Sequence, residues 1–370
     1  MLEPDDNIGV SRGILVPAVR SYAARPLSVL ASPGLAVREH NPYTWLLYSQ
    51  MQCTVDDFSL SRAFMGRYEV LHLHWPEIGF NASPDAARAY LQLKSWFLAV
   101  DIMKSRGTRV VWTVHNLESH DRRYPRLERW FWRELIDRLD GYIALSADGK
   151  TQAMNRFPRL RKIPGFVVPH GHYREEYPDT ECVSPRRSLS LPERAKIFLF
   201  FGQIRPYKNL PLLINTFRAC AEPDLLLYIA GQSKDEITTR ELLKLIDGDT
   251  RIRLEPNHVP KEQVHIYFKA ADLIVLPYRD ILNSGAAILA LSFNRPALVP
   301  NKGTMGELSR QIGSKWVRTF ERLTSCELSA SMAWALSESR PQKVPLEHLD
   351  WRLLASQTLD AYRSLLGNNR

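Results

Sequence analysis

The chain has 370 residues, of which 45% are hydrophobic and 24% charged, and its formal net charge is +9. This length allows two domains with separate cores, and the composition is that of a folded globular protein. The positive charge favours an anionic partner, either a phosphorylated substrate or an anionic membrane surface. Nucleic acid is the weakest candidate, because the sequence has no tract dense in Lys and Arg.

The cysteines and the N-terminal residues indicate a cytoplasmic location. The four cysteines are scattered without a Cys-x-x-Cys spacing, so neither a disulfide framework nor a cysteine metal site is expected. The first residues are acidic and lack the apolar segment of a secretory signal. No apolar run approaches the roughly 20 residues of a membrane-spanning helix.

Strand and helix signals alternate in the first half of the chain. Apolar runs typical of buried strands are followed by amphipathic segments, the pattern of a parallel sheet with helices on both faces. Strands are expected at 27–31, 68–74, 109–114 and 142–145, and helices at about 42–52, 84–106 and 126–140.

A polar, proline-bearing segment at 174–194 is the best linker, and the alternation resumes after it. Strands are expected at 196–203, 225–230, 251–254, 272–277 and 297–300, and helices at 209–220, 235–247, 260–268, 283–293, 326–339 and 346–366. We therefore expect an α/β protein with two doubly wound, Rossmann-like domains facing a cleft. The first would span 1–175 and the second 176–350, with a C-terminal helix of about 351–370 packing back on the first.

The strand that ends at Phe201 is followed by a candidate phosphate-binding segment. Gly202 lets the backbone approach a ligand, the helix that follows offers unpaired N–H groups, and Arg205 and Lys208 supply positive charge. This combination suits the diphosphate of a nucleotide sugar. A second approach follows the strand 272–277, where Asn283, Ser284 and Gly285 open a helix with small residues.

Polar clusters follow the predicted strands of the first half, where ligands bind in doubly wound sheets. They hold six of the ten histidines together with two carboxylates: His72, His74, Glu77, His115, His120, Asp121, His170 and His172. Each histidine alone is best explained as a structural residue, whereas the group favours a substrate site. Tyr43 belongs to the same expected acceptor or sugar site.

Three competing interpretations remain open at this point. His72 and His74 could bind zinc with His115 or Glu77, although no established zinc spacing supports this. Asp247-Gly248-Asp249 resembles a metal-binding Asp-x-Asp motif, but it follows a helix and fits a solvated turn better. The segment 122–133 mixes arginines with Trp130, Phe131 and Trp132, so it could lie on an anionic bilayer or pack its aromatic side on the sheet.

The order of the motifs resembles one family. The matching segments are Asn41-Pro42-Tyr43, Val70–Glu77, His115–Asp121, His170–Arg174, Phe201–Lys208 and Val275–Gly285. They are similar to the family of the xanthan-pathway GDP-mannose:glycolipid 4-β-D-mannosyltransferase, which consists of inverting GT-B enzymes. The resemblance implies the donor GDP-mannose, a polyprenyl-diphosphate-linked oligosaccharide as acceptor, and a peripheral position on the inner face of the cell membrane.

The resemblance also assigns roles. Arg205 and Lys208 would neutralise the diphosphate without a metal, so no cofactor is expected. Glu77 and Asp121 are the preferred general bases, and His115 is the third choice. His258 would lie at the guanine base, and Glu307 near the ribose or sugar.

The absence of the glutamate pair of retaining enzymes agrees with an inverting mechanism. Retaining GT-B transferases carry a Glu-x7-Glu pair, and the nearest residues here are the apolar Ile281 and Leu289. The alternatives are a transferase of this fold that uses UDP-glucose or UDP-glucuronate, a nucleotide-sugar epimerase, and a non-catalytic nucleotide-binding protein.

Overall fold

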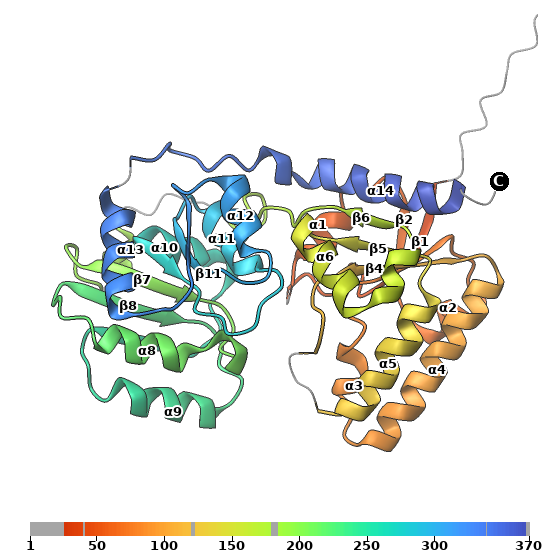
Figure 1. The fold of residues 1–370 in the computed structure, drawn as a ribbon, viewed down its shortest axis with the longest axis horizontal. Helices are drawn as coiled ribbons and strands as arrows, with labels where there is room; N and C mark the ends of the chain where they lie inside the picture. The colour runs from red at the N-terminus through yellow and green to blue at the C-terminus, as the bar shows by residue number, and fades with distance from the viewer. Residues whose placement is uncertain (1–25, 40, 120–122, 179–183, 338, 368–370) are drawn as a thin grey trace, which may run out of the picture.

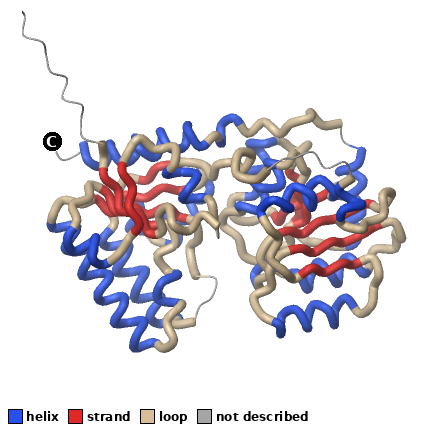
Figure 2. The backbone as a smooth tube through the Cα atoms, turned by 180° about the vertical axis from the view of Figure 1, so that it is seen from behind, coloured by secondary structure: helices blue, strands red, loops and turns tan. Residues whose placement is uncertain are grey.

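The computed structural model describes residues 26–39, 41–119, 123–178, 184–337 and 339–367. Within them, two six-stranded parallel sheets lie side by side, each with helices on both faces (Figure 1). Seen from behind, the two sheets remain separate, and one long C-terminal helix runs along the edge of the molecule (Figure 2).

The first sheet has the strand order β2-β1-β3-β4-β5-β6. Its strands are β1 (Ser28–Ser32), β2 (Thr54–Asp57), β3 (Val70–Leu73), β4 (Arg109–Val114), β5 (Gly141–Ala144) and β6 (Gly165–Val167). Its helices are α1 (Tyr43–Tyr48), α2 (Leu60–Met65), α3 (Ile78–Asn81), α4 (Ala86–Ser105), α5 (Pro125–Arg138) and α6 (Ala147–Arg156). The inner strands are apolar and buried, as expected for a sheet covered on both faces.

The second sheet has the order β12-β11-β10-β7-β8-β9. Its strands are β7 (Lys196–Phe201), β8 (Leu225–Ala230), β9 (Ile252–Glu255), β10 (Leu273–Val275), β11 (Ala297–Pro300) and β12 (Val317–Phe320). The helices of this half are α7 (Pro185–Ser188), α8 (Leu210–Arg218), α9 (Glu236–Ile246), α10 (Val264–Ala270), α11 (Gly285–Ser292), α12 (Met305–Ile312) and α13 (Ser325–Ser337). The first strand of this half, β7, lies inside the sheet; β8 and β9 are added on one side of it, and β10, β11 and β12 on the other. Ligands bind in such folds at the switch point, which here lies between β7 and β10.

Helix α14 (Trp351–Gly367) follows the second domain in sequence but packs on the first. The Leu365 side chain fills the space beside Gly141 in β5, and the Trp351 indole N–H donates to the His172 carbonyl oxygen over 2.6 Å. A segment of the first domain therefore shares its core with the end of the chain, while the division of the chain at residues 175 and 176 stays a prediction.

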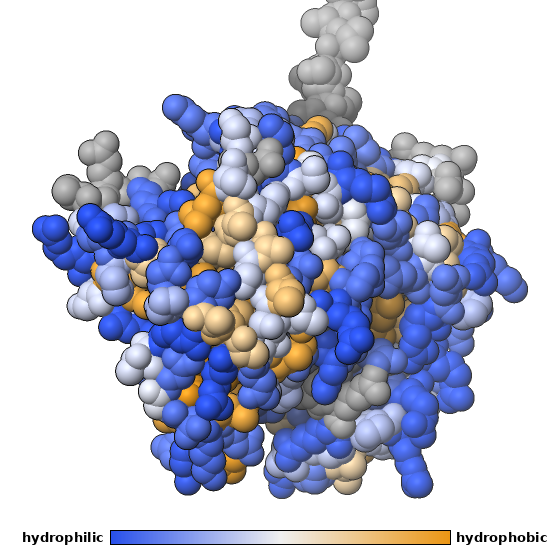
Figure 3. Space-filling model, turned by 60° about the vertical axis from the view of Figure 1, so that its left-hand side comes forward, coloured by the Kyte–Doolittle hydropathy of each residue, from blue (hydrophilic) through white to orange (hydrophobic). Residues whose placement is uncertain are grey.

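The expected alternation of strands and helices is present in both halves. Among the described helices and strands, eight were not expected from the sequence, namely β2, α2, α3, α6, β6, α7, α12 and β12. No helix in the described ranges is long and apolar enough to cross a membrane. The face that Figure 3 shows is mostly hydrophilic, with a small apolar group near its centre, an ordinary distribution for a folded domain.

Candidate active site

The loop after β7 has the geometry expected of an anion-binding segment. Gly202 adopts a φ of +125°, and a Cβ atom there would lie 3.1 Å from the Lys208 Nζ. Lys208 lies in a short 3-10 helix, Pro206–Lys208, just before α8. Glycine is therefore required at 202 both for the backbone conformation and for the close approach of the lysine.

The Lys208 ammonium group is buried, and its environment disfavours its charge. Burial, followed by the nearby charge of Arg205, lowers the pKa of Lys208 from 10.5 to about 8. Its Nζ lies over the rings of Phe200 and Tyr278, and no carboxylate of the described residues forms an ion pair with it. An anion placed here would relieve the repulsion between two adjacent cations, as expected of a diphosphate site.

A cavity of about 110 Å³ lies beside Lys208 and is shared by both domains. The first domain contributes Asn116, the residue after His115 at the end of β4. The second domain contributes the rest of the lining: Tyr207, Lys208, Tyr278, Asp280, Ile281, Leu282, Asn283, Ser284, Gly285 and Ala286. The two approaches to phosphate expected from the sequence therefore meet in one cavity.

The start of α11 forms one wall of this cavity. The Ser284 hydroxyl caps the helix by accepting from the Ala287 N–H over 3.1 Å. A Cβ atom on Gly285 would lie 3.1 Å from the Tyr173 hydroxyl and 3.6 Å from the His170 Nε2. A side chain at 285 would thus crowd the Tyr173 hydroxyl and come into van der Waals contact with His170.

Glu77 begins α3 directly after the cluster that follows β3, and its side chain is buried. Burial raises the pKa of Glu77 to about 7, while a hydrogen bond from the Asn116 side chain opposes part of this shift. Asn116 also lines the cavity that contains Lys208, so Glu77 lies near this cavity without lining it. Such a pKa suits a general base that works near neutral pH.

The histidines of the first domain form a buried, uncharged cluster. Burial lowers the pKa of His72 to about 3 and of His170 to about 4, and it lowers those of His74 and His115 well below the ordinary value. Tyr43 packs edge-on against His74, His115 and His170, with the closest ring centroids 4.7 Å apart. His115 is therefore a neutral group and a weak base, although the sequence named it as a candidate.

Two residues that we expected to hold the donor, Asn283 and Glu307, form hydrogen bonds between the domains. The Asn283 amide donates to the carbonyl oxygens of Val114 and His115, over 3.3 and 3.0 Å. The Glu307 carboxylate accepts from the N–H groups of Ala147 and Asp148, at the start of α6, over 3.1 and 2.7 Å.

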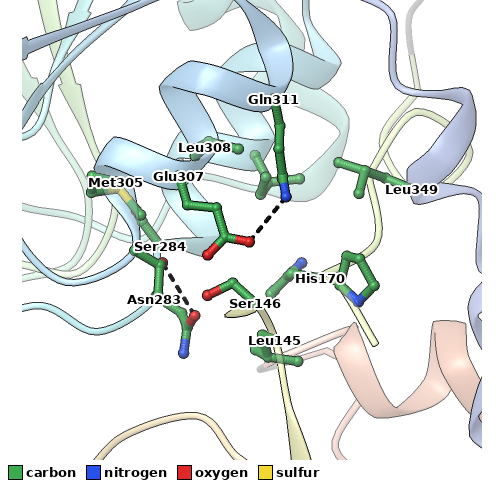
Figure 4. A pocket seen from close by; sticks show the side chains of 13 residues that line it. Leu145, Ser146, His170, Asn283, Ser284, Met305, Glu307, Leu308, Gln311 and Leu349 are labelled. Atoms are coloured by element: carbon green, nitrogen blue, oxygen red, sulfur yellow. Dashed lines mark hydrogen bonds between the residues drawn. The ribbon is translucent and has the colours of Figure 1, made fainter. Parts of the chain in front are cut away.

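Figure 4 shows the Glu307 carboxylate in a smaller cavity, with the Gln311 amide donating to it over 3.0 Å. Ser146, His170 and Asn283 lie around it (Figure 4). A carboxylate at a helix N-terminus complements the helix dipole, so Glu307 stabilises the contact between the domains.

The remaining candidates are dispersed. His258 is exposed in the loop after β9 and lines neither cavity. The His172 backbone binds α14, and burial lowers the pKa of its ring. His120 and Asp121 lie outside the described residues. The assigned roles of all these residues stay predictions.

The metal interpretations gain no support from geometry. In the part of the chain that the structure describes, no group of three His, Cys, Asp or Glu residues could hold a metal ion. Asp247 and Asp249 of the Asp-x-Asp sequence pair with Arg218 and Arg251 at 3.0 and 2.8 Å. Their carboxylates therefore have structural partners in the turn after α9.

Sequence reasoning missed Asn116 as a site residue, and it missed the contribution of α6 to the domain contact. Asn116 follows His115 directly, so its place at the end of a buried strand was the available signal. The start of α6 carries a Ser146 hydroxyl that accepts from the Gly149 N–H over 2.9 Å, a recognisable helix cap.

Comparisons with known proteins agree with this geometry. The family described as "Glycosyl transferases group 1" matches residues 184–338, the second sheet and its helices up to α13. The GDP-mannose:glycolipid 4-beta-D-mannosyltransferase of Xanthomonas campestris pv. campestris is 29% identical over 97% of this chain and 99% of its own length. The resemblance inferred from the motifs is thus confirmed over nearly the whole chain.

Solved structures share the fold at low sequence identity. A glycosyltransferase from Rickettsia africae has a TM-score of 0.63 and 12% identity, over 94% of this chain and 100% of its own. The Anabaena protein HepE in complex with UDP-glucose has a TM-score of 0.60 and 15% identity, over 92% of this chain and 98% of its own. The chain has the GT-B fold, and the group 1 match over residues 184–338 supports glycosyltransferase activity.

Proposed function

We propose that this glycosyltransferase moves mannose from GDP-mannose, with inversion, to a polyprenyl-diphosphate-linked oligosaccharide in exopolysaccharide assembly. The similarity to the Xanthomonas enzyme over 97% of the chain supports the donor and the lipid-linked acceptor. The chemistry is supported by one observation above the others. Buried Lys208 of the second domain and Asn116 of the first line the same cavity, and Asn116 lies close enough to the buried Glu77 to lower its pKa.

The leaving group is GDP, whose diphosphate gains negative charge as the sugar departs. Lys208 and Arg205 supply two positive charges, and Lys208 is already removed from water. A charge fixed in a site that excludes water stabilises developing negative charge without reorganisation. The reaction therefore needs no metal ion, and we expect turnover to persist with excess chelator.

The acceptor hydroxyl must lose a proton during an inverting transfer. We propose Glu77 as the general base, because its pKa of about 7 lies close to the working pH. Asp121 remains the alternative base. His115 is less suitable, since burial and then its proximity to His170 and His72, which disfavours a positive charge, lower its pKa well below the ordinary value.

We propose that the lipid-linked acceptor and the membrane meet the lower end of the first domain, where α3, α4 and α5 come together (Figure 1). Ile78 and Leu91 are 59% and 64% exposed there. Exposed Arg126 and Arg129 lie on α5. Apolar groups beside cations favour an anionic bilayer. Ile78 directly follows the proposed base, which would bring a lipid-anchored hydroxyl close to Glu77.

The aromatic side of α5 does not contribute to that surface. Phe131 and Trp132 are buried in the core of the first domain, and half-buried Trp130 packs on Tyr90 with ring centroids 5.4 Å apart. Of the two interpretations of segment 122–133, these contacts support the one in which the aromatic side packs on the sheet, and the proposed membrane surface is shared among three helices instead. Binding to phosphatidylglycerol vesicles should weaken in Arg126→Glu and remain in Arg240→Glu, an exposed arginine on α9.

A thermal-shift panel of nucleotides tests the donor. A ligand that binds only the native state raises its stability, so GDP and GDP-mannose should raise the melting temperature more than UDP, UDP-glucose or UDP-glucuronate. Preference for a uridine nucleotide would exclude GDP-mannose as the donor and favour a UDP-hexose transferase. Stabilisation by none of them would favour a function without a nucleotide sugar.

A further inference from the structure

Five buried side chains are hydrogen-bonded in series between helix α14 and the end of β4. We name Tyr362, His72, Tyr48, His74 and His115, in that order, the histidine–tyrosine chain. The Tyr362 hydroxyl lies 2.6 Å from the His72 Nδ1, and the Tyr48 hydroxyl lies 2.8 Å from the same nitrogen. Tyr48 is also 2.7 Å from the His74 Nε2, and the His74 Nδ1 is 3.1 Å from the His115 Nε2.

The chain connects parts of the sequence that are far apart. Tyr362 is 290 positions from His72, and it reaches the first domain because α14 packs on α1. At the other end, His115 precedes Asn116, which lines the cavity beside Lys208 and lowers the pKa of the proposed base Glu77. A residue on the last helix is thus connected through hydrogen bonds to the edge of the active site.

Every ring of the chain is uncharged in the folded protein. Burial lowers the pKa values of all three histidines and raises those of Tyr48 and Tyr362. A neutral imidazole carries one proton, so one ring nitrogen donates and the other accepts. The position of each proton is therefore set by the neighbouring group in the chain.

The distances favour one direction for the protons. The His72 Nε2 lies 2.7 Å from the Thr113 hydroxyl, and when it donates there the Nδ1 carries the single lone pair, with two tyrosine hydroxyls beside it, of which Tyr362 is the closer. If Tyr362 donates to His72, the Tyr48 proton is left for the His74 Nε2. His74 then carries its own proton on Nδ1 and donates it to the His115 Nε2, so the His115 proton lies on Nδ1.

We propose that Tyr362 is a positioning residue of the active site, whose hydroxyl proton sets the direction of the histidine–tyrosine chain and so fixes His115 as the Nδ1–H tautomer. Without that hydroxyl, Tyr48 can donate to either His72 or His74, and both directions of the chain become accessible. His115 would then exchange between two tautomers. The consequence for turnover rests on the proposed glycosyl transfer, whereas the tautomer itself does not.

The tautomer is measured in the protein without substrate. Protein labelled with ¹⁵N-histidine is compared as wild type, Tyr362→Phe and Thr358→Val by two-bond ¹H–¹⁵N correlation, with the His115 signals assigned from His115→Gln. Thr358 lies one turn away on α14, and its buried hydroxyl bonds only the Leu354 carbonyl oxygen among the described residues. We expect a protonated Nδ1 and a bare Nε2 for His115 in wild type and in Thr358→Val, and averaged shifts in Tyr362→Phe.

Turnover gives the second readout. Tyr362→Phe should lower kcat roughly tenfold, within the range typical for residues that orient a site residue, with the donor KM changed less than twofold. Tyr48→Phe interrupts the same chain at its middle, so it should cause a similar loss, and the double variant should lose little more than either. Thr358→Val should retain wild-type turnover.

Three results would overturn the proposal: a His115 proton on Nε2 in wild type, an unchanged His115 signal in Tyr362→Phe, or an equal loss of kcat in Thr358→Val. A protein that transfers no sugar would refute the proposed function alone, because the ¹⁵N shifts test the chain independently. Tyr48→Phe provides the same spectroscopic test if Tyr362→Phe folds poorly.

Discussion

The side-chain amide of Asn283 donates a hydrogen bond to the backbone carbonyl oxygen of His115 over 3.0 Å. Asn283 precedes α11 in the second domain, whereas His115 ends β4 in the first. The residue therefore ties the two walls of the cavity together at the point where the candidate base and the candidate diphosphate site meet. Closure of the domains and assembly of the site depend on the same contact.

Asn283→Ala should weaken activity by separating the domains. It removes two hydrogen bonds across the interface, each with a net value of about 0.5–1.5 kcal/mol. We expect kcat/KM to fall roughly tenfold, the equivalent of about 1.4 kcal/mol, with an increase in the radius of gyration by X-ray scattering. Asn301→Ala, which removes an exposed amide bonded to Glu321, is the matched control. Unchanged activity with unchanged scattering would refute the role of Asn283 in closure.

Glu307→Gln separates a structural role from a donor-binding one. The change removes the negative charge at the start of α6 and places an amide N–H against backbone N–H groups. We expect a loss of about 1 kcal/mol in unfolding free energy, with the donor Kd within twofold of wild type. Glu241→Gln, on the exposed surface in the middle of α9, should change neither. A tenfold weaker donor affinity would instead place Glu307 at the ribose or sugar.

Glu77 should set the acidic limb of the pH–rate profile. Its pKa is raised from 4.5 to about 7, and only the ionised form can accept a proton, so turnover should rise with pH up to about 7. Glu77→Gln should lower kcat by about 10²–10⁴-fold and leave the donor Kd unchanged. Asp121→Asn is the companion variant. Near-normal turnover in Glu77→Gln together with a large loss in Asp121→Asn would identify Asp121 as the general base.

The same pKa makes a prediction about stability. Between pH 4.5 and 7 the folded state binds more protons at Glu77 than the unfolded state does, so this residue lowers stability as the pH rises through that window. Glutamine mimics the protonated carboxyl group and does not ionise. Glu77→Gln should therefore melt at a higher temperature than wild type at pH 8, and at a similar temperature at pH 4.5. An equal loss of stability at both pH values would show that Glu77 is held as a structural anion.

The alternation of strands and helices in the two domains was predictable, because the inner strands of a parallel sheet are continuous apolar runs, as in Ile197–Phe200. The unexpected elements lack that signal. Strand β2 has the sequence Thr-Val-Asp-Asp at the sheet edge, and α6 is mostly polar. The site was predictable where glycine and cations cluster locally, as in the loop after β7. The site was not predictable where interacting residues are far apart in the sequence. The Ala147 N–H and the Glu307 carboxylate, for example, are hydrogen-bonded although they are 160 positions apart.

Lys208 should make donor binding depend on pH. Its pKa is lowered to about 8, so the ammonium group loses its proton above pH 8 in the free protein. GDP affinity should be constant from pH 6 to 7.5 and fall above pH 8, with proton uptake on binding seen by calorimetry in buffers of different ionisation enthalpy. Lys208→Met should bind GDP roughly 10–100-fold more weakly, without this pH dependence. Proton release, or a pH dependence retained in the variant, would mean that another group is titrating.

Transfer of labelled mannose tests the central claim most directly. Purified protein is incubated with GDP-[¹⁴C]mannose and lipid-linked acceptors from membranes of the producing organism, and the radioactivity extracted into butanol is counted. We predict incorporation that persists in EDTA, is lost in Glu77→Gln or Lys208→Met, and yields a β-linked mannose in the isolated product. Incorporation from UDP-[¹⁴C]glucose but not from GDP-mannose, or an α-linked mannose, would contradict the account.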